Sequence, residues 1–242
     1  MLRAFRAKHG SDYLEGFCLR GREVTRLESF SDAVFGFALT LLVVSLDVPR
    51  TFADLVNTMR GFPSFAICFI LLALIWNAHY NYCRRYGLED TTARVLTCVM
   101  LFLVLFYVYP LKFLFNLSIN GLIMHTQGAA LRMTLGQFSA LMTIYGLGLA
   151  AVYLALVLLY LHAYRLREAL ELNDLECLDT RFQAFRLACM VAVGLIGALL
   201  AQIPFTVSWS GLIYLALFPI LRIHRIVHRR KRAPLLANTP GR

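Results

Sequence analysis

Charged residues are scarce in this chain. Of its 242 residues only 16% are charged, whereas 59% are hydrophobic. Soluble domains carry about a quarter of their residues as charged side chains, and a soluble core cannot absorb so large an apolar excess. This composition excludes a cytosolic enzyme, a secreted miniprotein and a disordered chain, and it predicts a membrane protein.

The common enzyme motifs are missing as well. The sequence holds no HExxH, GxSxG, Walker or EF-hand pattern, and no GxGxxG pattern that opens a helix. Its six histidines occur one at a time, whereas a metal site needs three or four convergent ligands. We therefore expect no enzyme activity, no cofactor and no resident metal ion.

Six uncharged stretches have about the length that crosses a bilayer. The last two come from one uncharged run, 187–221, which as a single helix would be about 52 Å long, too long for one crossing of about 30 Å. We divide this run at Gln202, Pro204, Ser208 and Ser210. The predicted spans are 33–46, 61–82, 95–111, 135–164, 187 to about 203, and about 207 to 221. The predicted fold is an all-α, polytopic membrane protein with six transmembrane helices.

The basic residues predict the orientation in the lipid bilayer. Twenty of the 24 Lys and Arg fall on the side of both termini, and the opposite side holds only Arg50, Arg60, Lys112 and Arg132. By the positive-inside rule both termini are cytoplasmic, in a multi-pass protein of the cell membrane. The net charge of +10 then reflects topology, and no nucleic-acid partner is expected. We predict a cytoplasmic segment 1–25, a channel domain 26–228 and a basic, disordered tail 229–242.

The start of the first span carries a recognisable pattern. The segment reads Arg26-Leu27-Glu28-Ser29-Phe30-Ser31-Asp32, an Arg, three further residues and then Phe-Ser-Asp, and Ala-Leu-Thr-Leu-Leu follows at 38–42. Further matches are Leu-Asp-Val-Pro at 46–49 and the segment 76–80, Trp-Asn-Ala-His-Tyr. Over residues 26 to 112 the chain resembles the transmembrane protein 175 family of potassium channels.

That resemblance implies a homotetramer whose first helices surround a central pore for K⁺ and other monovalent cations. In the family, bulky apolar residues on this helix form the constriction. The matching positions are Phe37 for the narrowest ring, then Thr40, Leu41 and Val44, with K⁺ bound transiently near Thr40. Family members more often carry Ile or Leu where this chain has Phe37, which leaves the radius of the constriction open.

The helical period, taken independently of the family, puts these four residues on one side. At about 100° per residue they form a stripe about 100° wide, and Asp32 points about 140° away from Phe37. By periodicity alone an ordinary packing seam is the commoner explanation of such a stripe. Thr40 has a second interpretation too, a hydrogen bond back to the carbonyl of Gly36.

Asp32 needs a partner on another segment if it is buried, because a lone carboxylate at the edge of the bilayer is costly. His79 lies at about the right depth, and Trp76 offers an indole N–H one turn deeper. The alternative is that Ser31 or Asp32 caps the first helix. The predicted structural network of the signature comprises Arg26, Phe30, Ser31, Asp32, Trp76 and His79.

We therefore expect a leak-type cation channel with a modest preference for K⁺ over Na⁺ and a hydrophobic gate on the first helix. Two alternatives remain. A secondary ion carrier would need an ionisable residue inside the membrane, which spans three to six almost entirely lack. A non-conducting membrane scaffold would use the stripe as a packing seam.

Overall fold

Long antiparallel helices make up almost all of the fold. The computed structural model describes residues 13–14, 17–21, 23–44, 50–122, 133–203, 205–206 and 211–237. Its elements are β1 (Tyr13–Leu14), β2 (Phe17–Cys18), α2 (Arg26–Val44), α3 (Phe52–Arg60), α4 (Phe62–Tyr86), α5 (Thr91–Leu122), α6 (Leu135–Arg165), α7 (Asp174–Ala201), the 3-10 helix η3 (Leu212–Ala216) and α8 (Leu217–Ala237).

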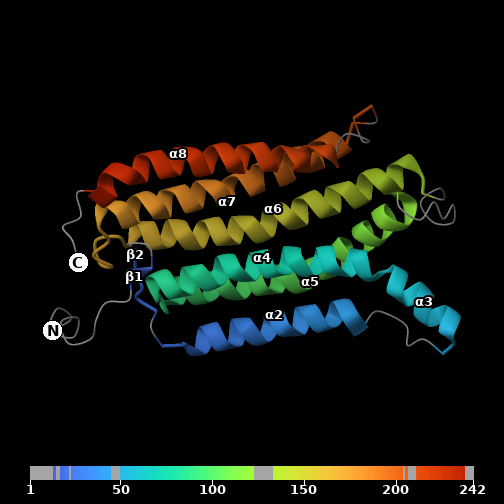
Figure 1. Ribbon diagram of the computed structural model, residues 1–242, viewed down its shortest axis with the longest axis horizontal. Helices are drawn as coiled ribbons and strands as arrows, with labels where there is room; N and C mark the ends of the chain where they lie inside the picture. Colours follow the sequence, from blue (N-terminus) through green and yellow to red (C-terminus); the bar gives the residue numbers. More distant parts are fainter. Residues whose placement is uncertain are drawn as a thin grey trace.

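In the described part of the chain four helices, α4 to α7, are long and apolar enough to cross a membrane. The helices α2, α4, α5, α6, α7 and α8 run side by side, with α2 at one edge beside α4 and α5 and with α8 at the other beside α7 (Figure 1). The start of α2, the end of α4, the start of α7 and the end of α8 lie at the same end of the bundle. The chain is an all-α, multi-pass membrane protein.

The tightest packing joins α6 and α7, where small residues let the two backbones meet. A Cβ added to Gly146 would lie 2.6 Å from the carbonyl oxygen of Gly194, and one added to Gly194 would lie 2.8 Å from the carbonyl oxygen of Gly146. Gly148 faces the ring of Tyr107 on α5 in the same way. In lipid there is no hydrophobic driving force between helices, and the close van der Waals contact that small residues allow holds them together instead.

Most predicted spans correspond to helices, with longer ends. α6 matches the stretch 135–164 to within one residue, and α7 ends at Ala201, where the uncharged run was divided. α7 begins 13 residues before the predicted span, since its first turns are polar and are capped by Asn173, whose side chain accepts from the N–H of Glu176. The short helix α3 and the small β1–β2 hairpin were not predicted.

The end of the chain differs from the prediction. The stretch from about 207 to 221 is not one helix, because η3 and then α8 occupy its described part and α8 runs on to Ala237. The expectation of a disordered tail is therefore wrong for residues 229–237, while 238–242 lie outside the described residues. The helix is held by Asp179 of α7, which accepts from His228 at 2.7 Å and pairs with Arg232 at 3.2 Å.

A candidate ion path on helix α2

One side of α2 is buried and the other is open. Phe35, Ala38 and Leu42 pack into the core against α4 and α5. The opposite side carries Ala33, Gly36, Phe37 and Thr40, all exposed in the single chain, and we call these four residues the open face. A Cβ added to Gly36 would meet nothing within 4 Å.

Two of the four predicted pore residues lie on the open face. Phe37 is 58% exposed, and Thr40 lies one turn beyond it. Leu41 is half-buried and packs against the core, so its side chain lies at the border of this face. The side chain of Val44 lies outside the described residues, although its backbone is the last of the helix.

The hydroxyl of Thr40 donates to the carbonyl oxygen of Phe37 at 2.7 Å. The alternative bond to the carbonyl of Gly36 is therefore wrong by one residue. Since the hydroxyl proton points to the backbone, the lone pairs of Oγ1 remain available to a cation. A hydroxyl held in this way is an oxygen ligand of the kind that replaces part of the hydration shell of K⁺.

Asp32 has a partner on the neighbouring helix. Its carboxylate accepts a hydrogen bond of 2.7 Å from the indole Nε1 of Trp76, whose ring stacks on Tyr80 at 5.5 Å. His79, the first candidate, is not the hydrogen-bond partner. It is buried one turn away, with its Nε2 3.4 Å from the hydroxyl of Thr97 on α5. The reach of the indole N–H decides which of the two meets the carboxylate.

The helix does not begin at the Phe-Ser-Asp element. α2 starts at Arg26, and the backbone N–H of Glu28 donates to the hydroxyl of Thr25 at 3.2 Å, which is the geometry of an N-cap. The idea that Ser31 or Asp32 caps the helix is therefore wrong. Ser31 is instead buried inside it and donates to the carbonyl of Leu27 at 2.7 Å.

The signature residues thus divide into two groups. Ser31, Asp32, Trp76 and His79 lie in or beside the contact between α2 and α4. Arg26 and Phe30 are exposed, and at about 100° per residue they lie within about 20° of Phe37, on the side of the open face. Within the described ranges Arg26 forms no hydrogen bond or ion pair. The structure thus places these two apart from the network assigned to them.

Sequence reasoning missed a lysine that reaches the end of α2. The ammonium of Lys112 on α5 donates to the carbonyl oxygen of Leu42 at 2.7 Å. The last carbonyls of a helix lack partners in their own helix, and a cation near them is favourable. Lys112 lies just beyond the predicted span 95–111, and this position did not indicate which helix the Lys reaches.

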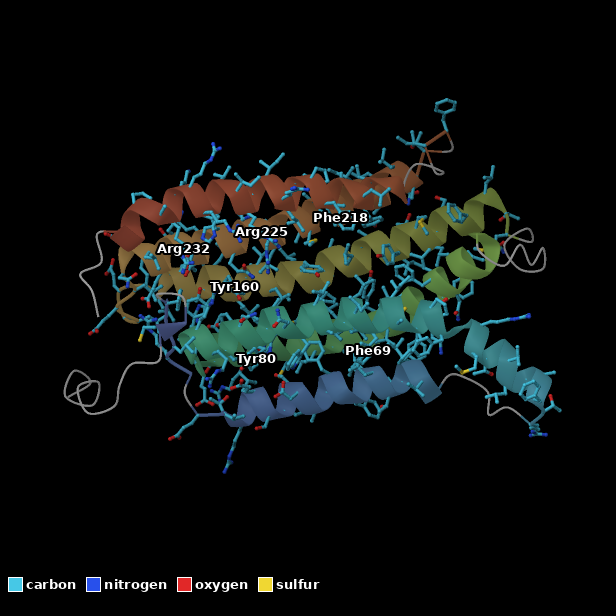
Figure 2. All side chains as sticks on the ribbon, viewed as in Figure 1. Phe69, Tyr80, Tyr160, Phe218, Arg225 and Arg232 are labelled. Atoms are coloured by element: carbon cyan, nitrogen blue, oxygen red, sulfur yellow. The ribbon has the colours of Figure 1, made fainter. Side chains whose placement is uncertain are left out.

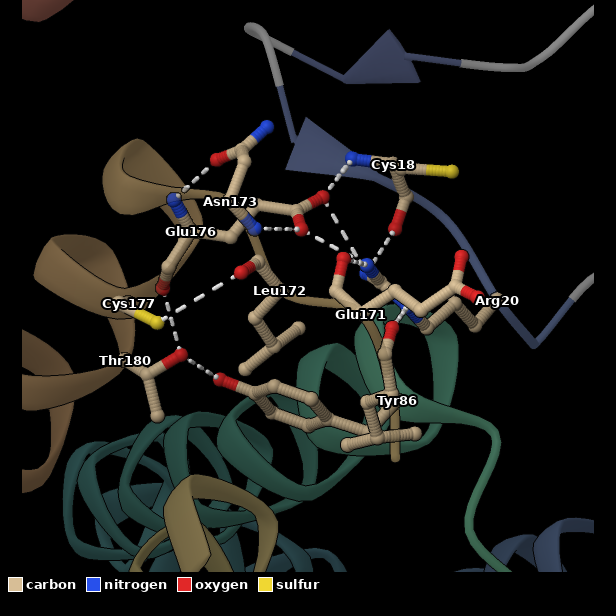
Figure 3. A network of polar contacts seen from close by, with 10 residues as sticks. Cys18, Arg20, Tyr86, Glu171, Leu172, Asn173, Glu176, Cys177 and Thr180 are labelled. Carbon is tan, nitrogen blue, oxygen red and sulfur yellow. Dashed lines mark hydrogen bonds and ion pairs between the residues drawn. The ribbon is translucent and has the colours of Figure 1, made fainter. Parts of the chain in front are cut away.

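The segment before α2 is fastened to the far side of the bundle by a buried ion pair (Figure 3). Arg20 binds Glu176 of α7 at 2.7 Å and also donates to the carbonyl of Leu170 at 2.9 Å. Glu176 accepts from the backbone N–H of Cys18 at 2.7 Å as well. Because the pair is satisfied on all sides, it fixes the segment leading to α2 at this end of the bundle.

Comparison with known proteins identifies the family of this chain. The family described as "Endosomal/lysosomal potassium channel TMEM175" matches residues 26–110. A protein of Marivirga tractuosa named "Potassium channel" is 38% identical over 232 residues, which cover 91% of this chain and 94% of that protein. The chain belongs to the TMEM175 family of potassium channels.

Two solved structures of TMEM175 proteins are similar as well. A variant of the potassium channel MtTMEM175, crystallised with a Nanobody-MBP fusion protein, superposes with a TM-score of 0.80 at 35% identity, over 90% of this chain and 99% of that one. A lysosomal potassium-selective channel TMEM175 homolog from Chamaesiphon minutus is more distant, with a TM-score of 0.46 at 23% identity, over 79% of this chain and 96% of that one.

Proposed function

We propose that four copies of this chain turn the open faces of α2 toward a common axis and so form a K⁺-permeable leak channel. The observation that carries the proposal is the open face itself. Phe37 is 58% exposed on a helix whose opposite side is fully packed. One α2 cannot enclose a path, so a closed symmetric assembly is required.

A ring of Phe37 side chains acts as the gate. An apolar ring that is narrow enough expels water and blocks hydrated ions, and widening the ring lets both pass. Phe is larger than the Ile or Leu that is usual in the family, yet its ring can move aside by rotation about the first side-chain torsion. The four residues of the open face carry no charge, and Arg26, on the same side of α2, lies about 16 Å before Phe37. Opening therefore depends on the width of the ring and not on voltage.

Thr40 provides the preference for K⁺. The hydroxyl donates its proton to the carbonyl of Phe37, so the lone pairs of Oγ1 can face a cation. Each copy then contributes one oxygen ligand next to the apolar ring. Removing water from K⁺ costs less free energy than removing it from Na⁺, so a few loosely held oxygen ligands favour K⁺ modestly. Leu41 and Val44 continue the wall beyond this ring.

In the membrane, α2 and the region of η3 and α8 add two crossings to the four apolar helices, which gives six. The basic residues gather at the end where α2 begins and α8 ends, so this end faces the cytoplasm. The protein then lies in the cell membrane, with both termini inside.

Recordings of K⁺ current from purified protein in vesicles test the gate. Phe37→Ala widens the ring and is expected to raise the conductance several-fold, whereas Phe37→Trp is expected to lower it. Val99→Ala on α5, also an exposed apolar side chain, serves as the matched control and should leave the current unchanged. Equal currents in all three variants would remove Phe37 from the constriction.

The number of subunits is measured independently, from the mass of the protein in detergent. A tetramer is expected. A monomer would contradict a shared path and would favour the scaffold, and a saturable, coupled flux would favour the carrier.

A further inference from the structure

A groove lies between α7 and α8, on the opposite edge of the bundle from α2 (Figure 1). It has a volume of about 640 Å³. One part of its lining is apolar, formed by Phe185, Ile220 and Ile223, and the other part, which we call cationic, carries Arg181 and Lys231 together with Leu178, Phe182 and Val227. Since Lys231 is 11 residues beyond Ile220, the two parts are roughly 16 Å apart along α8.

The cationic part faces the end of the bundle where α8 finishes. Figure 2 shows Arg232 toward that end of α8, Phe218 toward the other and Arg225 between them. By the orientation proposed above, the cationic part lies at the cytoplasmic surface and the apolar part at the depth of the acyl chains. The order of cationic and apolar parts along the groove thus matches the order of headgroup and acyl chains in a phospholipid of the inner leaflet.

The walls of the groove are built by aromatic contacts. The ring of Phe182 lies 5.0 Å from that of His224 and 4.8 Å from that of His228, and Phe185 stacks on His224 with 13° between the planes. The lysine and arginine that line the groove, Arg181 and Lys231, supply its positive charge.

No carboxylate in the described part of the chain neutralises these two cations. Asp179, the acidic residue nearby, is already bound by His228 at 2.7 Å and Arg232 at 3.2 Å. Arg181 and Lys231 form no ion pair among the described residues, and Lys231 lies 5.7 Å over the ring of Phe182. The cation–π contact with Phe182 positions the ammonium of Lys231 beside the groove.

We propose that this groove binds one anionic phospholipid of the inner leaflet. Arg181 binds the phosphate through the N–H groups of its guanidinium, and Lys231 binds it as a point charge. An acyl chain lies along Phe185, Ile220 and Ile223. The apolar wall distinguishes a lipid from a free phosphate, and the inner leaflet supplies the negative charge that complements the basic end of α8. The proposal depends on the orientation proposed above but not on what α2 lines.

Native mass spectrometry of the full chain in neutral detergent tests this site, with phosphatidylglycerol as the probe and phosphatidylcholine for comparison. The double variant Arg181→Gln, Lys231→Gln is expected to weaken the binding of phosphatidylglycerol roughly tenfold. The matched control Arg229→Gln, Arg230→Gln removes the same charge from exposed positions outside the groove, and it should change the affinity less than about threefold. Thermal unfolding without lipid should be the same in both variants.

A second arm tests the apolar wall. Ile223→Ser should weaken the binding of phosphatidylglycerol without removing charge. Equal losses in the two double variants would mean diffuse attraction to a basic helix and would overturn the proposal. So would equal binding of the two lipids, or displacement of phosphatidylglycerol by an equal concentration of inorganic phosphate. Because the readout is lipid binding, failure here is distinct from failure of the gate.

Discussion

The seam between α6 and α7 and the attachment of α2 differ in how closely the helices are packed within the chain. At the seam, Gly146 and Gly194 bring two backbones so close that neither position has room for a Cβ. α2 is packed on one side only, and at Gly36 a Cβ would meet nothing within 4 Å. Both sides of the seam lie within one chain, whereas the open face of α2 is exposed in the single chain. By the proposed function, further copies of the chain face it.

The largest effect is expected at the seam. In Gly194→Ala the new Cβ would lie 2.8 Å from the carbonyl oxygen of Gly146, so the helices must separate. Overpacking of this kind costs about 1–3 kcal/mol. Gly36→Ala is the control, and it should be neutral or stabilise by up to about 1 kcal/mol, since Ala favours a helix over Gly. Thermal unfolding in detergent measures the stability of both variants. A greater loss of stability in Gly36→Ala than in Gly194→Ala would contradict the difference in packing between the seam and the open face.

A smaller effect is expected where α2 is attached. Asp32→Asn replaces a charge-assisted hydrogen bond to Trp76 by a neutral one, at a cost of about 1 kcal/mol. We expect less tetramer and lower expression, with the preference for K⁺ over Na⁺ retained in the protein that assembles. Trp76→Phe removes the donor and should reproduce the loss. A normal tetramer with altered selectivity would instead place Asp32 in the path.

The smallest effect is expected at the exposed pair of Asp90 and His162, beside the start of α5. Burial raises the pKa of Asp90, but the imidazole of His162, 2.9 Å away, and the N–H groups at the start of α5 outweigh it and lower the pKa below its ordinary value. The carboxylate therefore stabilises the fold above its ordinary pKa of about 3.9, and this contribution is lost as the pH falls through the lower, folded value. Asp90→Asn should reduce stability by less than about 1 kcal/mol at pH 7 and by nothing in strong acid. A pH series of melting temperatures checks the sign.

Hydropathy predicted a helix end well wherever the helix and its uncharged stretch end together. α6 begins and ends almost where its uncharged stretch does, and α7 ends at Ala201, before the polar residues chosen as the break. It failed where a helix continues beyond its uncharged stretch. α2 starts at Arg26 because Thr25 caps it, and α8 continues to Ala237 because Asp179 binds its basic side chains. Such extensions depend on caps and on partners distant in sequence, which no apolar pattern reveals.

The sequence predicted on which side of α2 Asp32 lies, but it did not predict which residues the side chains of the site contact. The helical period placed Asp32 away from Phe37, and Asp32 does meet another helix. Whether Trp76 or His79 would be its partner depends on side-chain reach, and Lys112 could be assigned to Leu42 only from the packing of α5. The period also treated Leu41 as equal to Phe37, although the neighbouring helices cover half of Leu41.

The central claim, that the open face of α2 borders the ion path, is tested most directly by thiol accessibility at Thr40. Thr40→Cys places a thiol on this face, and Val99→Cys places one on an exposed position of α5. A charged thiol reagent, added while K⁺ current is recorded from reconstituted protein, is predicted to block Thr40→Cys and to leave wild type and Val99→Cys unchanged. If Thr40→Cys reacts no faster than these controls and its current persists, the face does not border the path.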